Sequence, residues 1–204
     1  MLTNLPPHEY FCFGPYLASF NVDPAFTNRM LQTGRKLKQS HKKNLAGKIK
    51  TELLYDHRGK DRWITENYYP FIESYLQGYK KFAHMSLNHV TGISLSSIWI
   101  NFQKKNEFNP IHIHTNCILS FVHWIRFPKA IIQEGKKDVT TSAGPGGITY
   151  HFGEDQPFVL TTREFVPKEN TLMIFPSTLK HEVIAFKSDV SRISVAGNII
   201  LHYD

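Results

Sequence analysis

A series of short β-rich segments fills the second half of the chain and limits its possible folds more than any other feature. From Gly92 onward, apolar and β-branched residues form runs that are separated by Gly, Pro, Asn, Asp and Lys. The runs are GISLSSIWINF, ILSFVHWIRF, GGITYHF, PFVLTT, TLMIF, HEVIAF and RISVAGNIIL. Such a series predicts a sandwich or barrel. Strands do not alternate with helices, which argues against a parallel nucleotide-binding sheet.

Two amphipathic helices are expected before this β-rich region. Asp23 and Pro24 are typical of a helix start, and apolar residues follow at helical spacing through Phe26, Met30 and Leu31. A second helix is expected from near Thr65, where large apolar residues recur every three or four positions: Phe71, Ile72, Tyr75, Leu76, Tyr79 and Phe82. We therefore expect a single domain over residues 1–204, helical over about 1–90, with a β core over about 91–204.

The composition fits a globular protein of the cell interior. A chain of 204 residues, 41% of them hydrophobic, suits one core. Cys12 and Cys117 lack a CxxC partner, so neither a disulfide scaffold nor a zinc ribbon is expected. The N-terminus lacks the features of a signal peptide, and no apolar stretch approaches the roughly 20 residues that span a bilayer. We expect a soluble, cytoplasmic protein.

The net charge of +7 raises the question of a nucleic-acid partner. Much of the excess lies in one Lys-rich segment, Arg35–Lys50, which is typical of a solvated helix face or loop. Nucleic acid is therefore possible as a partner but not favoured. The segment around Pro145–Gly147 predicts a turn, and no phosphate-binding glycine motif is present.

Two histidines separated by one residue are the first candidate metal ligands. His112 and His114 lie in the segment NPIHIHTN, just before a predicted strand. Alternate side chains of an extended chain point the same way, so both imidazoles can face one point. Among 11 histidines such a pair can also be ordinary surface or core residues. His181, at the start of another predicted strand, could supply a third ligand from a distant segment.

A strand near the C-terminus carries a charged residue where burial is expected. Arg192, Ser194 and Asn198 share one face, and the opposite face is apolar. A buried arginine is costly unless its charge is paired, and a planar guanidinium fits a carboxylate through two parallel hydrogen bonds. The pattern therefore indicates a dicarboxylate ligand, with the Ser194 hydroxyl adding a third bond. Arg192 could instead pair with Glu182 or reach solvent.

Four motifs together resemble those of iron(II)/2-oxoglutarate-dependent oxygenases, particularly a small phage and marine-bacterial branch. The motifs are HIHTNCILSFVHWI, GGITYHF, TLMIFPSTLKHEV and RISVAGNI, in the same order and spacing, over roughly Ser96 to Leu201. The resemblance implies a mainly β fold with N-terminal helices, namely a double-stranded β-helix (jelly-roll, cupin-like). A viral member would act in the host cytoplasm.

The resemblance also implies roles for seven residues of this chain. His112, His114 and His181 match the iron(II) ligands, and Arg192 and Ser194 match the pair that binds the remote carboxylate of 2-oxoglutarate. Asn101 and Asn198 are weaker candidates for lining the cosubstrate pocket, since strand-end hydrogen bonding would also explain them.

The second ligand position departs from the usual pattern of this superfamily, which has a carboxylate there. His114 occupies that position, and a neutral imidazole would leave the site one unit more positive than a carboxylate would. In an alternative arrangement, His114 and Asn116 are ligands and His112 lies outside the coordination shell. His123 and His151 could line the cavity, but we expect both to pack.

The activity implied by the resemblance consumes O₂ and decarboxylates 2-oxoglutarate to succinate while a substrate is hydroxylated. A peptide or protein side chain is expected as the primary substrate, with a small molecule also possible. One alternative is a cupin-like protein that binds metal without oxidative turnover. Another is an oxygenase directed at nucleic acid.

Overall fold

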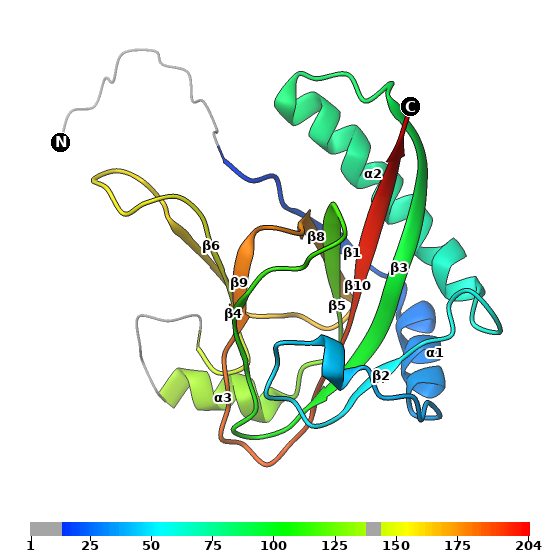
Figure 1. Ribbon diagram of the computed structural model, residues 1–204. Coiled ribbons are helices and arrows are strands. Elements are labelled where there is room, and N and C mark those ends of the chain that lie inside the picture. Colours follow the sequence, from blue (N-terminus) through cyan, green and yellow to red (C-terminus); the bar gives the residue numbers. More distant parts are fainter. Residues whose placement is uncertain (1–13, 138–143) are drawn as a thin grey trace.

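The computed structural model describes residues 14–137 and 144–204 and shows a mainly β protein (Figure 1). The strands are β1 (Ala18–Asn21), β2 (Glu52–Leu54), β3 (Val90–Gln103), β4 (Asn109–His112), β5 (Leu119–Arg126), β6 (Ile148–His151), β7 (Thr162–Phe165), β8 (Thr171–Pro176), β9 (Lys180–Val183) and β10 (Arg192–Tyr203). The helices are α1 (Pro24–Gly34), α2 (Trp63–Ala83), α3 (Lys129–Lys137) and a short 3-10 turn at Lys42–Asn44.

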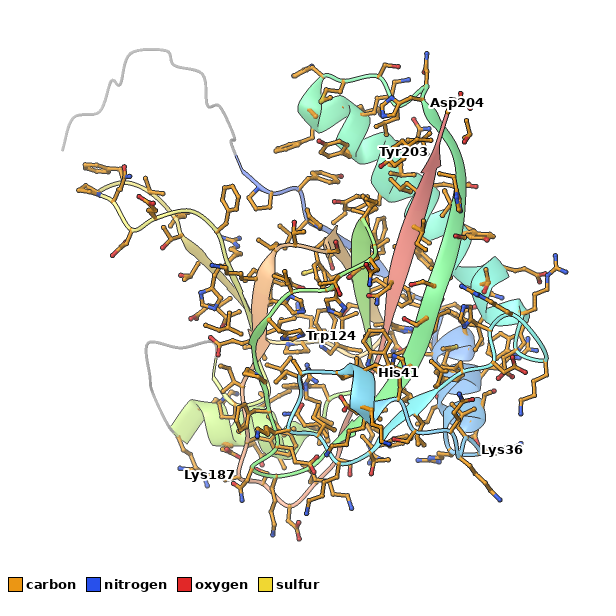
Figure 2. All side chains as sticks on the ribbon, in the orientation of Figure 1. Lys36, His41, Trp124, Lys187, Tyr203 and Asp204 are labelled. Carbon is orange, nitrogen blue, oxygen red and sulfur yellow. The ribbon has the colours of Figure 1, made fainter. Side chains whose placement is uncertain are left out.

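The strands form two antiparallel sheets. The larger sheet has the order β1-β8-β5-β10-β3-β2, and the smaller one has the order β4-β9-β6-β7. Residues of both sheets pack into one apolar cluster that includes Trp124, which lies in the interior of the molecule in Figure 2. Two packed antiparallel sheets with these crossovers form the double-stranded β-helix that the family resemblance implies.

Helices α1 and α2 cover the face of the larger sheet that is turned away from the smaller one (Figure 1). Side chains alternate across a strand, so Ile193 and Val195 of β10 pack with these helices, while Arg192 and Ser194 point to the other face. The helical layer therefore leaves the inner face of the sheet free to carry polar residues.

Both expected helices are present. Asp23 caps α1, since its side chain accepts a 2.8 Å hydrogen bond from the Ala25 amide, and Pro24 is the first helical residue. α2 begins at Trp63, slightly earlier than the expected start near Thr65. His123 of β5 ties the helices to the sheet, because its ring is hydrogen-bonded to Thr27 of α1 and Tyr68 of α2, each at 3.0 Å. His123 therefore packs in the core, as expected.

Two local predictions were wrong, and one helix was missed. PFVLTT is not a strand, because only its last residue enters β7, and Phe158 adopts a left-handed backbone (φ 62°) with its side chain fully exposed. α3 was not predicted, since a nine-residue helix with Ile131 as its buried residue has too little periodicity. The N-terminal part is also not purely helical, because β1 and β2 form the two edges of the larger sheet.

The Lys-rich segment Arg35–Lys50 forms a loop with one 3-10 turn, and its lysines are exposed. Among the described residues, no helix is both long and apolar enough to cross a membrane.

Candidate active site between the two sheets

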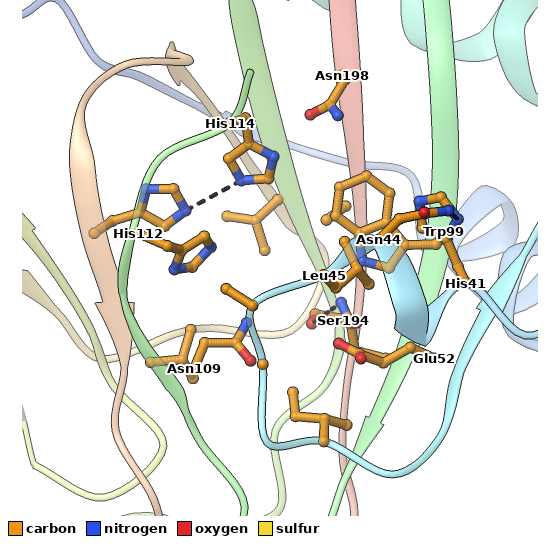
Figure 3. A pocket seen from close by; sticks show the side chains of 18 of the residues that line it. His41, Asn44, Leu45, Glu52, Trp99, Asn109, His112, His114, Ser194 and Asn198 are labelled. Carbon is orange, nitrogen blue, oxygen red and sulfur yellow. Dashed lines mark hydrogen bonds between the residues drawn. The ribbon is translucent and has the colours of Figure 1, made fainter. Parts of the chain in front are cut away.

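A cavity of about 380 Å³ lies between the sheets and is closed on one side by the segment 41–49. The smaller sheet contributes Asn109, His112, Ile148, His181 and Val183 to its lining, and the larger sheet contributes Glu52, Trp99, Asn101, Arg192, Ser194 and Asn198 among others. Figure 3 shows His112, His114 and Asn109 on one side of the cavity, with Ser194 and Glu52 on the other. Polar groups from distant segments thus converge on a volume suited to a small ligand.

Three histidines meet at one end of this cavity. His112 ends β4 and lies directly opposite His181 of β9, while His114 follows two residues after His112. One ring nitrogen of each residue lies within 4.8 Å of those of the other two. The Nε2 atoms of His114 and His181 are 3.3 Å apart. This spacing allows one metal ion to bind all three rings.

Backbone carbonyls fix the orientation of two of these rings. His112 Nδ1 lies 2.7 Å from the Pro110 carbonyl oxygen, and His181 Nδ1 lies 2.8 Å from that of Leu179. A carbonyl oxygen can only accept, so both Nδ1 atoms carry the proton and donate it. The Nε2 lone pairs are therefore available to a metal ion.

The lowered pKa values of the three histidines also favour the binding of a metal ion. Burial, together with the neighbouring His112, lowers the pKa of His114 to about 4 and that of His181 to about 3. Burial lowers the pKa of His112 as well. Neutral imidazoles offer lone pairs near pH 7, so a metal ion would not compete with protons there.

Asn116, the alternative ligand, lies outside this cluster. Its side chain is exposed, its backbone is left-handed (φ 59°), and it is not among the residues that line the cavity. Among the described residues, no carboxylate joins the three histidines within ligand distance of one another. The donor set that the structure brings together is thus composed of three imidazoles.

Arg192 is 2% exposed and lines the same cavity. Its Nη1 donates a 3.1 Å hydrogen bond to Gln103 Oε1, whereas Nε and Nη2 are buried without a partner. Burial lowers the pKa of Arg192 to about 10, and Tyr150 opposes this shift. Among the described residues, Glu182 forms no ion pair with Arg192, and its carboxylate lies 3.2 Å from His151 Nε2 instead. The guanidinium therefore directs two free donors at a site that requires an acceptor.

The other three predicted pocket residues lie beside it. Asn101 Nδ2 donates to Ser194 Oγ at 3.4 Å, which leaves the Ser194 hydroxyl proton free to point elsewhere. Asn198 accepts from Ser120 at 3.1 Å and donates to Ser97 at 3.3 Å. Asn198 also raises the pKa of His114 through a side-chain hydrogen bond. Both asparagines thus line the cavity, and Asn198 makes the hydrogen bonds of an ordinary strand residue, whereas Asn101 Oδ1 is buried without a partner.

Sequence reasoning missed four polar residues of this region, namely Gln103, Tyr150, Glu52 and Asn109. Gln103 could have been found, because it follows Asn101 at the strand spacing and lies opposite Arg192 in the register. Tyr150 lies in the GGITYHF motif, and its hydroxyl is buried without a partner. Glu52 lies on a three-residue strand that has no recognisable pattern.

One cavity of this jelly-roll brings together a histidine cluster that can hold a metal ion and a buried arginine with two donors that can bind a carboxylate. The family described as "Putative 2OG-Fe(II) oxygenase" matches residues 97–198, which is half of the chain. The protein belongs to this family and is a 2-oxoglutarate-dependent dioxygenase. A search of curated proteins found no match.

Solved structures share the fold at low sequence identity. A prolyl-4-hydroxylase from Pseudomonas putida aligns with a TM-score of 0.56 and 9% identity, over 91% of this chain and 92% of that one. A viral collagen prolyl hydroxylase from Paramecium bursaria Chlorella virus-1, solved with 2-oxoglutarate, gives 0.57 and 11%, over 91% and 96%. A Trichoplax adhaerens prolyl hydroxylase bound to a peptide of hypoxia inducible factor gives 0.53 and 12%, over 92% and 83%. These likenesses confirm the double-stranded β-helix.

Proposed function

We propose that the protein binds one iron(II) through His112, His114 and His181 and hydroxylates a peptide or protein side chain at the expense of 2-oxoglutarate and O₂. Iron(II) with 2-oxoglutarate would supply the oxidation, in which O₂, 2-oxoglutarate and a substrate C–H bond give succinate, carbon dioxide and the C–OH product. The protein's own residues bind and orient the reactants.

The unpaired guanidinium of Arg192 is the observation that carries this proposal. Two buried N–H groups without acceptors would cost several kcal/mol in a protein that binds nothing there. A carboxylate of 2-oxoglutarate fits this fork, because it can accept from Nε and Nη2 in parallel. Gln103 accepts a hydrogen bond from Nη1 of Arg192 and thereby fixes the plane of the guanidinium group.

Two hydroxyl groups complete the carboxylate site that we propose. The Ser194 hydroxyl can donate into the cavity because Asn101 already donates to its oxygen. The Tyr150 hydroxyl is buried without a partner, and Tyr150 and Arg192 influence each other's pKa. Donors from β10 of the larger sheet and from β6 of the smaller sheet would then surround a single carboxylate.

The donor set of three imidazoles fits iron(II), and it adds no negative charge to the site. Without a ligand carboxylate, the dianionic cosubstrate would meet a more positive centre than in the usual arrangement, which favours its binding. The Trp99 ring lies 5.8 Å from that of His114 and, with Leu45 of the segment 41–49, gives the cavity an apolar wall that helps to exclude water.

The choice of a peptide or protein side chain rests on the fold relatives, which include a prolyl hydroxylase solved with a peptide fragment and a collagen prolyl hydroxylase. A small-molecule substrate would fit the same cavity. The exposed lysines of the segment 35–50 would favour a nucleic-acid substrate, which is the second candidate.

Anaerobic loading followed by exposure to O₂ tests the proposal. Iron(II) and 2-oxoglutarate should together give a charge-transfer absorption band, and O₂ should then give succinate, at a rate that a peptide library raises. An Arg192→Met variant should lose the band at 2-oxoglutarate concentrations that saturate the wild type. A band that never forms, or 2-oxoglutarate that is never consumed, would favour a cupin-like metal-binding protein without turnover.

A further inference from the structure

Glu52 of β2 is a buried acid in the cavity that the chemistry above does not use. Its residue is 1% exposed, and its Oε2 has no hydrogen-bond partner. The register places Glu52 opposite Asn101, which in turn lies opposite Ser194, so the three side chains share the inner face of the sheet. An unpaired carboxylate in such a place is costly unless a ligand supplies its partner.

Glu107 shows how this protein satisfies a buried carboxylate that has only a structural task. Its Oε1 accepts from the Lys50 amide at 3.2 Å and its Oε2 from the Lys104 amide at 2.9 Å. The backbone thus supplies partners for Glu107, whereas none is supplied for Glu52 Oε2. Repulsion from Glu107 raises the pKa of Glu52, so the two acids lie near each other. They differ mainly in their hydrogen-bond partners.

A second unpaired acceptor lies beside Glu52. Asn109 Oδ1, from the opposite sheet, is buried without a partner. Asn109 Oδ1 and Glu52 Oε1 both lie within 3.3 Å of the point where a side chain on Gly47 would begin. Asn109 Oδ1 occupies the position that a side chain on Gly47 would need, so glycine at this position allows the Asn109 amide to approach Glu52.

The cosubstrate cannot satisfy the two unpaired oxygens, Glu52 Oε2 and Asn109 Oδ1. The carboxylates of 2-oxoglutarate are acceptors and would be repelled by Glu52, while Arg192 and Ser194 provide donors for them. The positive charge of Lys42 lowers the pKa of Glu52. Lys42 is nevertheless exposed and does not form an ion pair with Glu52 within 4.0 Å. A hydrogen-bond donor that enters the cavity would satisfy both oxygens.

We propose that Glu52 and Asn109 form a subsite for a cationic nitrogen of the primary substrate, an ammonium or guanidinium group. This inference rests on the proposed oxygenase function and narrows its substrate class to basic peptides or amines. The subsite would hold the cation at the Glu52 side of the cavity, while His112 and His114 lie across from it. A cation held there would orient the rest of the substrate toward the histidines.

A charged donor fits this subsite better than a neutral one. Burial raises the pKa of Glu52 to about 7, so in the empty cavity the carboxyl is only partly ionised near neutral pH. An entering cation would favour the ionised form and gain a charge-assisted hydrogen bond from it. Asn109 Oδ1 could accept a second N–H of the same group.

A pair of matched ligands tests the subsite. N-acetyl-lysine methylamide carries the ammonium, and N-acetyl-norleucine methylamide is its neutral counterpart. Calorimetric titration under nitrogen, on protein with and without iron(II) and 2-oxoglutarate, should show the lysine ligand binding about tenfold more tightly. Glu52→Gln should reduce this preference to about twofold or less. Glu66→Gln, which changes an exposed acid on α2, should retain it.

Equal binding of the two ligands to the wild type, or a preference that survives Glu52→Gln, would overturn the subsite. The absorption band of the loaded sample reports the iron and 2-oxoglutarate site separately. If the band fails to form, the proposed function is wrong, while titration of the unloaded protein still decides on the subsite. If the band forms and the preference is absent, only the substrate class is wrong.

Discussion

Arg192 and Gln103 lie opposite each other in the register of β10 and β3 and are joined by a 3.1 Å hydrogen bond. This bond occupies Nη1 and leaves the Nε and Nη2 edge of the guanidinium without a partner. A carboxylate binds best to such an edge through two parallel bonds. The Gln103 contact therefore positions Arg192 for a ligand that comes from outside the chain.

Arg192→Met is expected to lower the affinity for 2-oxoglutarate by about 100-fold, because a bidentate charge-assisted pair is lost. Iron(II) affinity should change by less than about threefold, since Arg192 does not belong to the histidine cluster. Anaerobic titration of the charge-transfer band measures the first quantity, and competition with a chelating dye measures the second.

The stability of the same variant separates a binding role from a structural one. In the absence of 2-oxoglutarate, Arg192→Met should be at least as stable to urea as the wild type, because it removes a buried charge that lacks an acidic partner. A loss of more than about 2 kcal/mol would show that the guanidinium stabilises the fold instead.

His114→Ala should weaken iron(II) binding by more than about 100-fold, whereas Asn116→Ala should change it by less than about twofold. The reason is that His114 Nε2 lies 3.3 Å from His181 Nε2, while the Asn116 side chain is exposed. Calorimetry with iron(II) under nitrogen compares the two variants. The opposite ranking would support the arrangement in which Asn116 is a ligand.

His123 should make the protein sensitive to acid. Burial lowers its pKa to about 3 from an ordinary 6.5, so between these values the unfolded chain binds a proton that the folded protein does not. Stability is then fully present above pH 6.5 and falls as the pH decreases, by up to about 1.4 kcal/mol per pH unit. Urea unfolding of His123→Gln should show a shallower pH dependence, with His89→Gln as a surface control. An unchanged profile would contradict this account.

Glu52 should give the stability of the protein the opposite pH dependence. Burial raises its pKa to about 7 from 4.5, so the folded protein retains a proton that the unfolded chain releases in this range. Stability is lost as the pH rises from about 4.5 to 7, by up to about 1.4 kcal/mol per pH unit. Glu52→Gln should lack this loss and be more stable than the wild type above pH 7. Equal stability of the two proteins at pH 8 would show that the carboxyl is not buried in solution.

The predictable part of the site lies on long strands with regular alternation. In β10, the apolar Ile193 and Val195 point to the helices, and this forces Arg192 and Ser194 into the cavity. The sequence also offered His181 as a third ligand from a distant segment, whereas its pairing with His112 comes from the register of β4 and β9. The roles of these residues as ligands remain predictions.

The unpredictable part lies where tertiary packing decides the structure. Glu52 reads as an ordinary charged residue after a Lys-rich segment, and only the pairing of β2 with β3 turns it into the cavity. The segment 41–49 was expected to be solvated, yet Leu45 and Gly47 line the cavity. Phe158 and its neighbours have strand-like composition but no element to pair with.

An anaerobic crystal structure with iron(II) and 2-oxoglutarate tests the central claim most directly. We predict the metal ion bound to Nε2 of His112, His114 and His181, and one carboxylate of 2-oxoglutarate bound to Nε and Nη2 of Arg192. A metal ion bound by Asn116 or by a carboxylate of the chain, or 2-oxoglutarate bound away from Arg192, would contradict the account.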